Sequence, residues 1–382
     1  MKSLLVLILL SLITACQSTK NKKKSEGWSG QMQSMANHVG ELIPFVYNRA
    51  EFQSTNNHNK ILDQLSALNK SAHNVPIEYS KKYLGDDPII KFSARNLNKD
   101  LVRAQKVFEE GNKEYARGVI KGALNHCFRC HTRNQFGPEY MQWNMNIGAF
   151  NIPPTSKVQL YIATRQYQKA KKEVEGFLNQ KFGVYNNSFE QEKALKQYLA
   201  LSVRVEKKPA ETARKLQLIL KNDKTPTYLK ESLKSWIRSL WIWSKESNPQ
   251  EVSLKKANQL IRKAIKIREF QSLDTANVEY LRATSVLHDM IAKTKDKKTR
   301  AQIFSLLGDS YDVLSEGGFW EIPELYYEAC VREWPRKGSL SKKCFIGYER
   351  SIILGYSGSM GILVPSVEKE KLLELKKMAG LE

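Results

Sequence analysis

The sequence predicts an all-α protein, in which a bundle of four helices is followed by a solenoid of helix hairpins. Three observations support this fold class. Apolar residues recur every three or four positions through most of the 382 residues, almost no segment alternates as a strand would, and Ile152-Pro153-Pro154 separates two regions of different pattern. An apolar content of 41% suffices for one large or two ordinary domains. We expect a first domain over residues 28–150 and a second over residues 151–382.

Residues 1–15 have the features of a signal peptide, because Lys2 precedes a short apolar stretch. That stretch is too short for a stable transmembrane helix. Its end, ITAC, resembles the bacterial lipobox, in which a peptidase cuts before a lipid-modified cysteine. The resemblance implies a mature protein that begins at Cys16, with a polar, basic tether over residues 16–27. Because Gln17 follows the cysteine, the sorting pattern implies a lipid anchor on the periplasmic side, in the outer membrane rather than the inner. The alternative is an ordinary signal peptide that is cut elsewhere.

Four amphipathic helical patterns fill the first domain, each with its apolar residues on one face. In chain order these faces consist of Met32, Met35, Val39, Leu42 and Val46; Ile61, Leu62, Leu65 and Leu68; Leu97, Leu101, Ala104 and Phe108; and Ala116, Ile120, Ala123 and Leu124. Helices of this length with short connections form an antiparallel bundle.

The fourth pattern ends in CFRCH, which places Cys127 and Cys130 one helical turn apart and His131 four residues after the first cysteine. All three side chains therefore project from one helix face. This arrangement suits haem c, since two thiols can form thioethers with the vinyl groups while the adjacent imidazole binds the iron. A zinc site would need a second ligand pair, and a thioredoxin-like motif would need a βαβ setting. We expect one covalent haem c.

The bundle pattern and its motif resemble cytochrome c′ and its low-spin relatives, the class II cytochromes c. The stretch QMQSMANHVGELIPFV resembles the first helix of that family, and the similarity covers residues 28–137. The resemblance implies that Cys127 and Cys130 hold the haem and that His131 is the proximal ligand. Met32 stands where the family has its distal residue, which is a methionine ligand in some members and a blocking apolar group in others.

Two positions depart from the family pattern. Trp28 replaces an arginine that is frequent before the distal position, and Gln135 replaces a basic residue after the proximal histidine. How the haem propionates are held and how the proximal side is tuned therefore stay open.

The distal ligand also has alternatives. Met35 lies one turn beyond Met32 and faces the same core, so it is the reserve candidate. A different class of cytochrome would take its methionine from downstream, which would make Met141 or Met145 the ligand.

The second domain consists of successive helical patterns. Leu307, Gly308 and Tyr311, followed by PELYYEACVREWP, resemble the tetratricopeptide repeat pattern, and the resemblance extends loosely over residues 155–380. It implies a solenoid of stacked helix hairpins with a groove for a partner. The alternative is an irregular helical domain of similar content.

Cys330 and Cys344 flank the turn of a predicted hairpin, and a disulfide between them would stabilise the protein by about 3 kcal/mol in an oxidising compartment. Counting supports this pair, since Cys16 would be acylated and two cysteines would bind haem. The alternative is two buried free thiols.

The net charge of +22 lies mostly in residues 151–382. Nucleic acid is not expected, because an exported protein rarely meets any. We expect the basic repeat domain to dock a redox or scaffold protein partner of acidic character, and the N-terminal lipid to bind the membrane. A homodimer through the bundle stays open.

Three functions are compatible with these features. Ligation by both Met32 and His131 would give a low-spin centre that transfers single electrons, which is the function we favour. An open distal side would bind nitric oxide or carbon monoxide. A third alternative is a repeat scaffold whose haem is structural. We expect no enzymatic activity, because no acid–base pair for peroxidase chemistry lies on the helix face that carries Met32.

Overall fold

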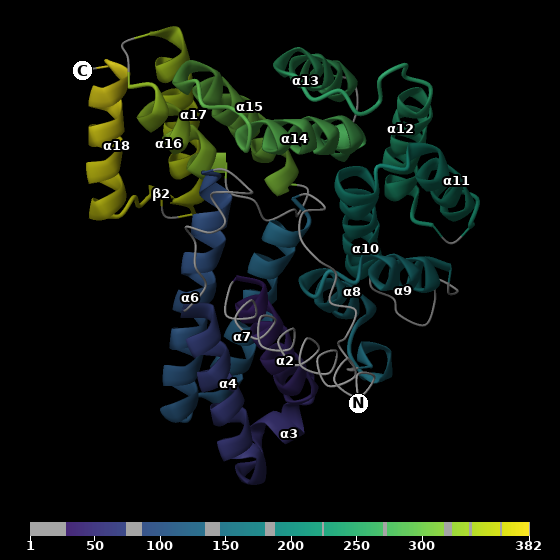
Figure 1. Ribbon diagram of the computed structural model, residues 1–382, viewed down its shortest axis with the longest axis vertical. Coiled ribbons are helices and arrows are strands. Elements are labelled where there is room, and N and C mark those ends of the chain that lie inside the picture. Colours follow the sequence, from purple (N-terminus) through teal and green to yellow (C-terminus); the bar gives the residue numbers. More distant parts are fainter. Residues whose placement is uncertain are drawn as a thin grey trace, which may run out of the picture. The chain divides into compact units, whose positions relative to one another are not determined.

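Within the part of the chain that the structure describes, the secondary structure is helical apart from one short antiparallel hairpin of β1 (Ser357–Gly358) and β2 (Gly361–Ile362) (Figure 1). The computed structural model describes residues 28–73, 86–133, 146–179, 188–223, 225–269, 273–316, 323–335, 338–359 and 361–381. This confirms the all-α fold class for these residues. In the same ranges, no helix is both long enough and apolar enough to cross a membrane.

Several predicted features lie outside the described residues. They are the signal peptide and tether, the lipidation candidate Cys16, the position of Gln135, and the alternative ligands Met141 and Met145.

The described chain divides into two compact units. The first contains residues 28–73 and 94–123, and the second contains residues 86–93, 124–133 and the described residues from 146 onward. The CFRCH motif therefore belongs to the second unit, together with the C-terminal helices.

The helices of the first unit share one hydrophobic core. They are α2 (Trp28–Tyr47), α3 (Arg49–Gln53), the 3₁₀ helix η1 (Thr55–Asn57), α4 (His58–His73), and the greater parts of α6 (Pro88–Glu109) and α7 (Lys113–His131). Gly111 forms the turn between α6 and α7 with a φ of 88°, a backbone conformation that glycine adopts at little cost. Almost every residue of the four predicted apolar faces lies in or against this core, among them Leu42, Leu65, Leu101 and Ile120.

The second unit is built from helices that pack against their neighbours in the chain. They are η2 (Ile147–Ala149), α8 (Pro154–Ala163), α9 (Tyr167–Asn179), α10 (Ser188–Ala200), the π-helical turn η3 (Leu201–Glu206), α11 (Pro209–Leu220), α12 (Thr227–Ser244), α13 (Leu254–Arg268), η4 (Leu273–Ala276), α14 (Asn277–Ile291), α15 (Lys297–Glu316), α16 (Pro323–Glu333), α17 (Ser339–Gly355) and α18 (Ser366–Ala379). Close pairs include α8 with α9, α11 with α12, α13 with α14, and α15 with α16.

Cys330 of α16 and Cys344 of α17 are joined by a disulfide, with their Cα atoms 6.1 Å apart. This is the pair that the sequence predicts. Both residues are fully buried, so the bond connects the two helices inside the core.

Two glycines allow α15, α16 and α17 to approach closely. A methyl carbon on Gly308 would lie 2.5 Å from the ring of Tyr327, and one on Gly347 would lie 2.6 Å from the same ring. The ring is held between the two glycines, and its hydroxyl donates to Asp309 at 3.0 Å. The Leu-Gly pair of the repeat-like pattern thus has a packing role, which is to accommodate Tyr327.

Gly308→Ala is expected to lower the free energy of unfolding by about 1–3 kcal/mol, because the added methyl group would overlap the buried ring of Tyr327 and force it to shift. Gly355→Ala in α17 is the matched control, since a methyl group there meets nothing within 4 Å. Urea unfolding of both variants measures the difference. Equal stabilities would contradict the packing role.

Candidate functional site

Cys127 and Cys130 lie on the last turn of α7 and are not bonded to each other. Both side chains are partly buried. Burial, with a further contribution from Cys130, raises the pKa of the Cys127 thiol to about 12, and burial likewise raises the pKa of Cys130. Both groups are therefore neutral thiols at pH 7, unlike redox-active cysteines, which are thiolates with lowered pKa values. The site presents two unactivated thiols on one helix turn.

His131 follows directly and is held in one tautomer. Its Nδ1 lies 3.2 Å from the carbonyl oxygen of Ile162, which can only accept, so Nδ1 carries the proton. Burial, and then the positive charge of Arg165, lower the pKa of His131 to about 3 against the opposing effect of the backbone carbonyls. The imidazole is thus neutral at pH 7 and its Nε2 lone pair is available to a metal.

The turn after α8 surrounds His131 from two sides. Besides the Ile162 carbonyl, the Tyr167 hydroxyl donates to the His131 carbonyl oxygen at 2.8 Å. The same Ile162 oxygen accepts the backbone N–H of Arg165 at 2.9 Å. One short segment therefore positions both the ring and the backbone of the predicted iron ligand.

A buried ionic cluster lies two residues beyond the motif. Arg133 Nε lies 2.7 Å from the Asp87 carboxylate, and His288 Nδ1 lies 2.8 Å from the same oxygen. Burial alone would raise the pKa of Asp87, but the positive charge of Arg133 and the hydrogen bond from His288 hold it well below its ordinary value. Burial lowers the pKa of His288 to about 4, so this imidazole is neutral at pH 7.

The cluster continues as a directed chain of hydrogen bonds. Since Nδ1 of His288 donates to Asp87, its Nε2 accepts the Tyr311 hydroxyl at 2.5 Å. Arg204 of the η3 turn donates to that hydroxyl at 2.6 Å. Tyr326 of α16 stacks on Tyr311, with ring centroids 5.2 Å apart. These contacts thereby join η3, α14, α15 and α16 to Asp87 and, through it, to Arg133 beside the motif.

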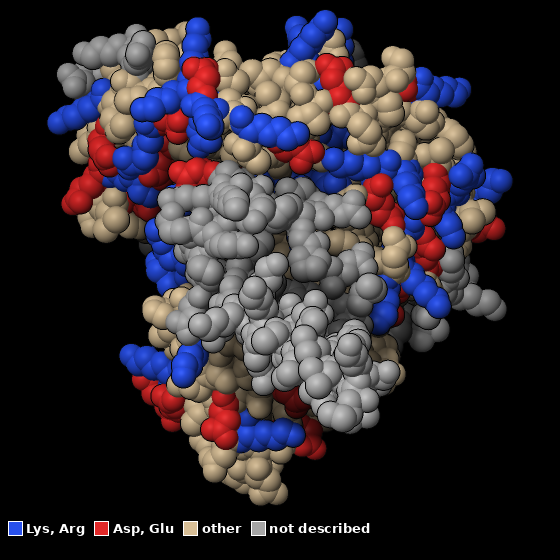
Figure 2. Space-filling view, viewed as in Figure 1, with Lys and Arg blue, Asp and Glu red and all other residues tan. Residues whose placement is uncertain are grey.

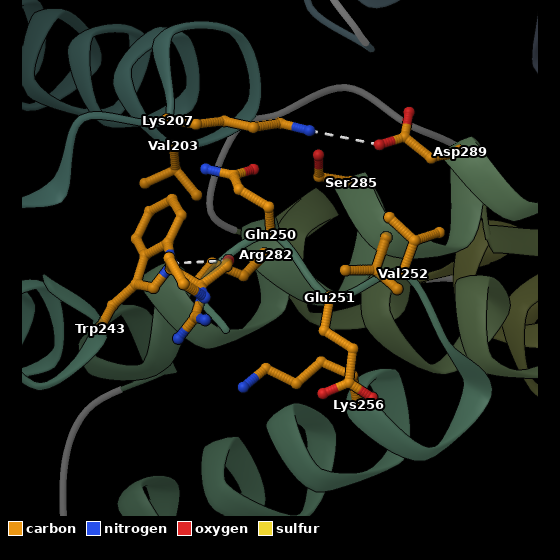
Figure 3. Close-up of a pocket in the computed structure, with 12 residues that line it drawn as sticks. Val203, Lys207, Trp243, Gln250, Glu251, Val252, Lys256, Arg282, Ser285 and Asp289 are labelled. Atoms are coloured by element: carbon orange, nitrogen blue, oxygen red, sulfur yellow. Dashed lines mark hydrogen bonds and ion pairs between the residues drawn. The ribbon is translucent and has the colours of Figure 1, made fainter. Parts of the chain in front are cut away.

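A hollow in the second unit is lined by residues that include Lys207, Trp243, Arg282, Ser285 and Asp289 (Figure 3). Its cations are paired with carboxylates. Lys207 lies 3.2 Å from Asp289, and Arg282 and Lys256 lie 2.6 Å and 2.8 Å from Glu246. The hollow therefore offers no surplus charge for an ionic ligand.

Met32 and Met35 lie on α2 in the first unit. Met35 belongs to the core, and Met32 is partly buried against it. Iron ligation by Met32 stays a prediction.

Among the described residues, no group of three or more His, Cys, Asp or Glu side chains is arranged to hold a metal ion. On the face that Figure 2 presents, the Lys and Arg side chains of the described residues are interspersed with Asp and Glu.

Comparisons of the chain with protein-family models, with curated proteins and with solved structures found no match.

Four residues near the motif were not predicted as functional: Asp87, Arg133, Arg165 and His288. Asp87 precedes a proline at the start of α6, and its side chain accepts the Ile89 N–H at 3.2 Å, which is a local capping signal. Its pairing with His288, 201 residues away, has no local signal.

His288 is expected to make stability depend on pH. Its folded-state pKa of about 4 lies below the ordinary 6.5, so the unfolded chain binds more protons between these values. The contribution of His288 is therefore complete above pH 6.5 and decreases as the pH falls toward 4. Between pH 7 and pH 5 the loss should be about 2 kcal/mol.

Urea unfolding at both pH values, compared with His288→Gln, isolates this contribution. The variant should lose about that much of the pH dependence, whereas His73→Gln, at an exposed position, should retain it. An unchanged pH dependence in His288→Gln would contradict a neutral, buried imidazole.

Proposed function

We propose that the chain is an exported, lipid-anchored c-type cytochrome that transfers single electrons through one covalently bound haem. The observation that carries the proposal is the state of His131. Its imidazole is buried and neutral, and the hydrogen bond to the Ile162 carbonyl places the single ring proton on Nδ1. Its Nε2 is thus presented for iron on the same helix turn as two unpaired thiols. These residues fit a haem attached at Cys127 and Cys130.

In this proposal each residue of the site has a distinct role toward the haem. The two cysteines fix the haem by thioethers, His131 binds the iron, and the carbonyl of Ile162 orients its ring. A haem held in this way supplies a reversible one-electron change at its iron. The burial of His131 limits the access of water on that side.

The proposal includes a finer architecture than all-α. The shared core of α2, α4, α6 and α7 supports a four-helix haem bundle like that of the class II cytochromes c. The consecutive packing of helices from α8 onward supports a repeat-like solenoid that docks an acidic protein partner. Periplasmic export and lipidation at Cys16 rest on the N-terminal sequence alone.

The test is the absorption spectrum of the haem-loaded protein, oxidised and reduced, with and without carbon monoxide. We expect low-spin spectra that carbon monoxide does not change. Met32→Leu keeps the side-chain volume but removes the sulfur, so it should give a high-spin centre that binds the gas.

Met35→Leu is the matched control and should leave the spectrum unchanged. A gas-induced shift in the unmodified protein would refute electron transfer as the main function and favour the gas-binding alternative. Loss of the low-spin spectrum in Met35→Leu instead would assign the ligand to Met35.

A further inference from the structure

Arg165 adopts a backbone conformation that disfavours any residue other than glycine. The φ of Arg165 is 56°. The Arg165 N–H donates to the Ile162 carbonyl at 2.9 Å, and the Gln166 N–H donates to the Tyr161 carbonyl at 2.7 Å. This is a Schellman motif with Arg165 at the position that glycine usually occupies. A non-glycine residue costs about 1 kcal/mol or more there.

The side chain of Arg165 is also buried without a carboxylate. Only 7% of the residue is exposed, and no described residue forms an ion pair or hydrogen bond with its guanidinium. Three other buried cations of the unit have carboxylate partners, at 2.7 Å for Arg133, 2.9 Å for Lys171 and 2.6 Å for Arg282, and the buried Arg204 donates to the hydroxyls of Thr284 and Tyr311. A buried charge needs such a partner, because desolvation without pairing is costly.

The position of Arg165 indicates where its partner belongs. It lies between Ile162 and Tyr167, the two residues that contact His131. The positive charge of Arg165 acts on both His131 and Cys130, where it contributes a lowering of the pKa. The backbone of Arg165 therefore bonds to the same Ile162 oxygen that orients His131, and its positive charge acts on the proposed haem attachment site.

We propose that Arg165 binds a propionate carboxylate of the haem attached at Cys127 and Cys130. The inference rests on the proposed function and assigns the propionate partner that Trp28 and Gln135 leave open. A planar guanidinium suits a carboxylate, since it can donate two parallel hydrogen bonds. The bound anion compensates both the buried charge and the strained backbone of Arg165.

This pairing has a consequence for the iron. An unpaired propionate stabilises the ferric state by its negative charge, and Arg165 offsets that charge. Removing the guanidinium should therefore favour the ferric state and lower the reduction potential.

The experiment measures the reduction potential at pH 7 and the resonance Raman bending band of the propionates, after intact mass has established covalent haem in each protein. Arg165→Gly removes the cation and relieves the left-handed strain, so it is expected to fold. Arg165→Lys keeps the charge. Lys207→Gly is the matched control, because Lys207 is also a cation with a φ of 54°, but it pairs with Asp289.

We expect Arg165→Gly to lower the reduction potential by about 59 mV, which corresponds to a tenfold lower ferrous-to-ferric ratio at a fixed potential. The variant should also shift the propionate band. Arg165→Lys should recover most of the potential, and Lys207→Gly should change neither quantity.

An unchanged potential in Arg165→Gly, an equal change in Lys207→Gly, or an altered potential without a band shift would each overturn the inference while leaving the haem in place. Absence of covalent haem from the unmodified protein would overturn the proposed function and the inference with it.

Discussion

The buried carboxylate of Asp87 is the constraint on which the second unit depends. An isolated carboxylate in the interior would be protonated or would unfold the region, because desolvation raises its pKa. Arg133 at 2.7 Å and His288 at 2.8 Å reverse that effect, and Tyr326 and the Ile89 N–H contact its other oxygen. One negative charge thereby joins the start of α6, the second residue after α7, and helices α14 and α16.

This arrangement bears directly on the candidate haem site. Arg133 is two residues from His131, so its bond to Asp87 fixes the chain where α7 ends. Ile162 and Tyr167 fix His131 from the other direction, through its ring and its carbonyl oxygen. A metal ligand held by its own backbone, by its ring nitrogen and by the residue two positions after it keeps its orientation when the charge at the metal changes. Such rigidity favours electron transfer, which needs little rearrangement.

The features that could be predicted from the sequence are those with local signals. Helical periodicity and the spacing of Cys127, Cys130 and His131 depend on neighbours within one or two turns, so they specify all-α structure and the motif directly. The bonds of Asp87 to His288 and of Arg204 to Tyr311 join residues 201 and 107 positions apart, and no periodicity encodes them. Arg165 was missed for another reason, because a helix C-terminus of this kind is ordinarily marked by glycine.

Intact mass shows whether haem is covalently bound at the motif. The exported chain is produced with a haem-attachment system and denatured in acid, which releases any haem that is not covalently bound. We expect the mass of the chain plus one haem. The added haem mass should be lost in the double variant Cys127→Ala, Cys130→Ala and retained in Cys330→Ser, Cys344→Ser. A mass without haem in the unmodified chain, or haem retained when the two motif cysteines are absent, would contradict covalent attachment at the motif.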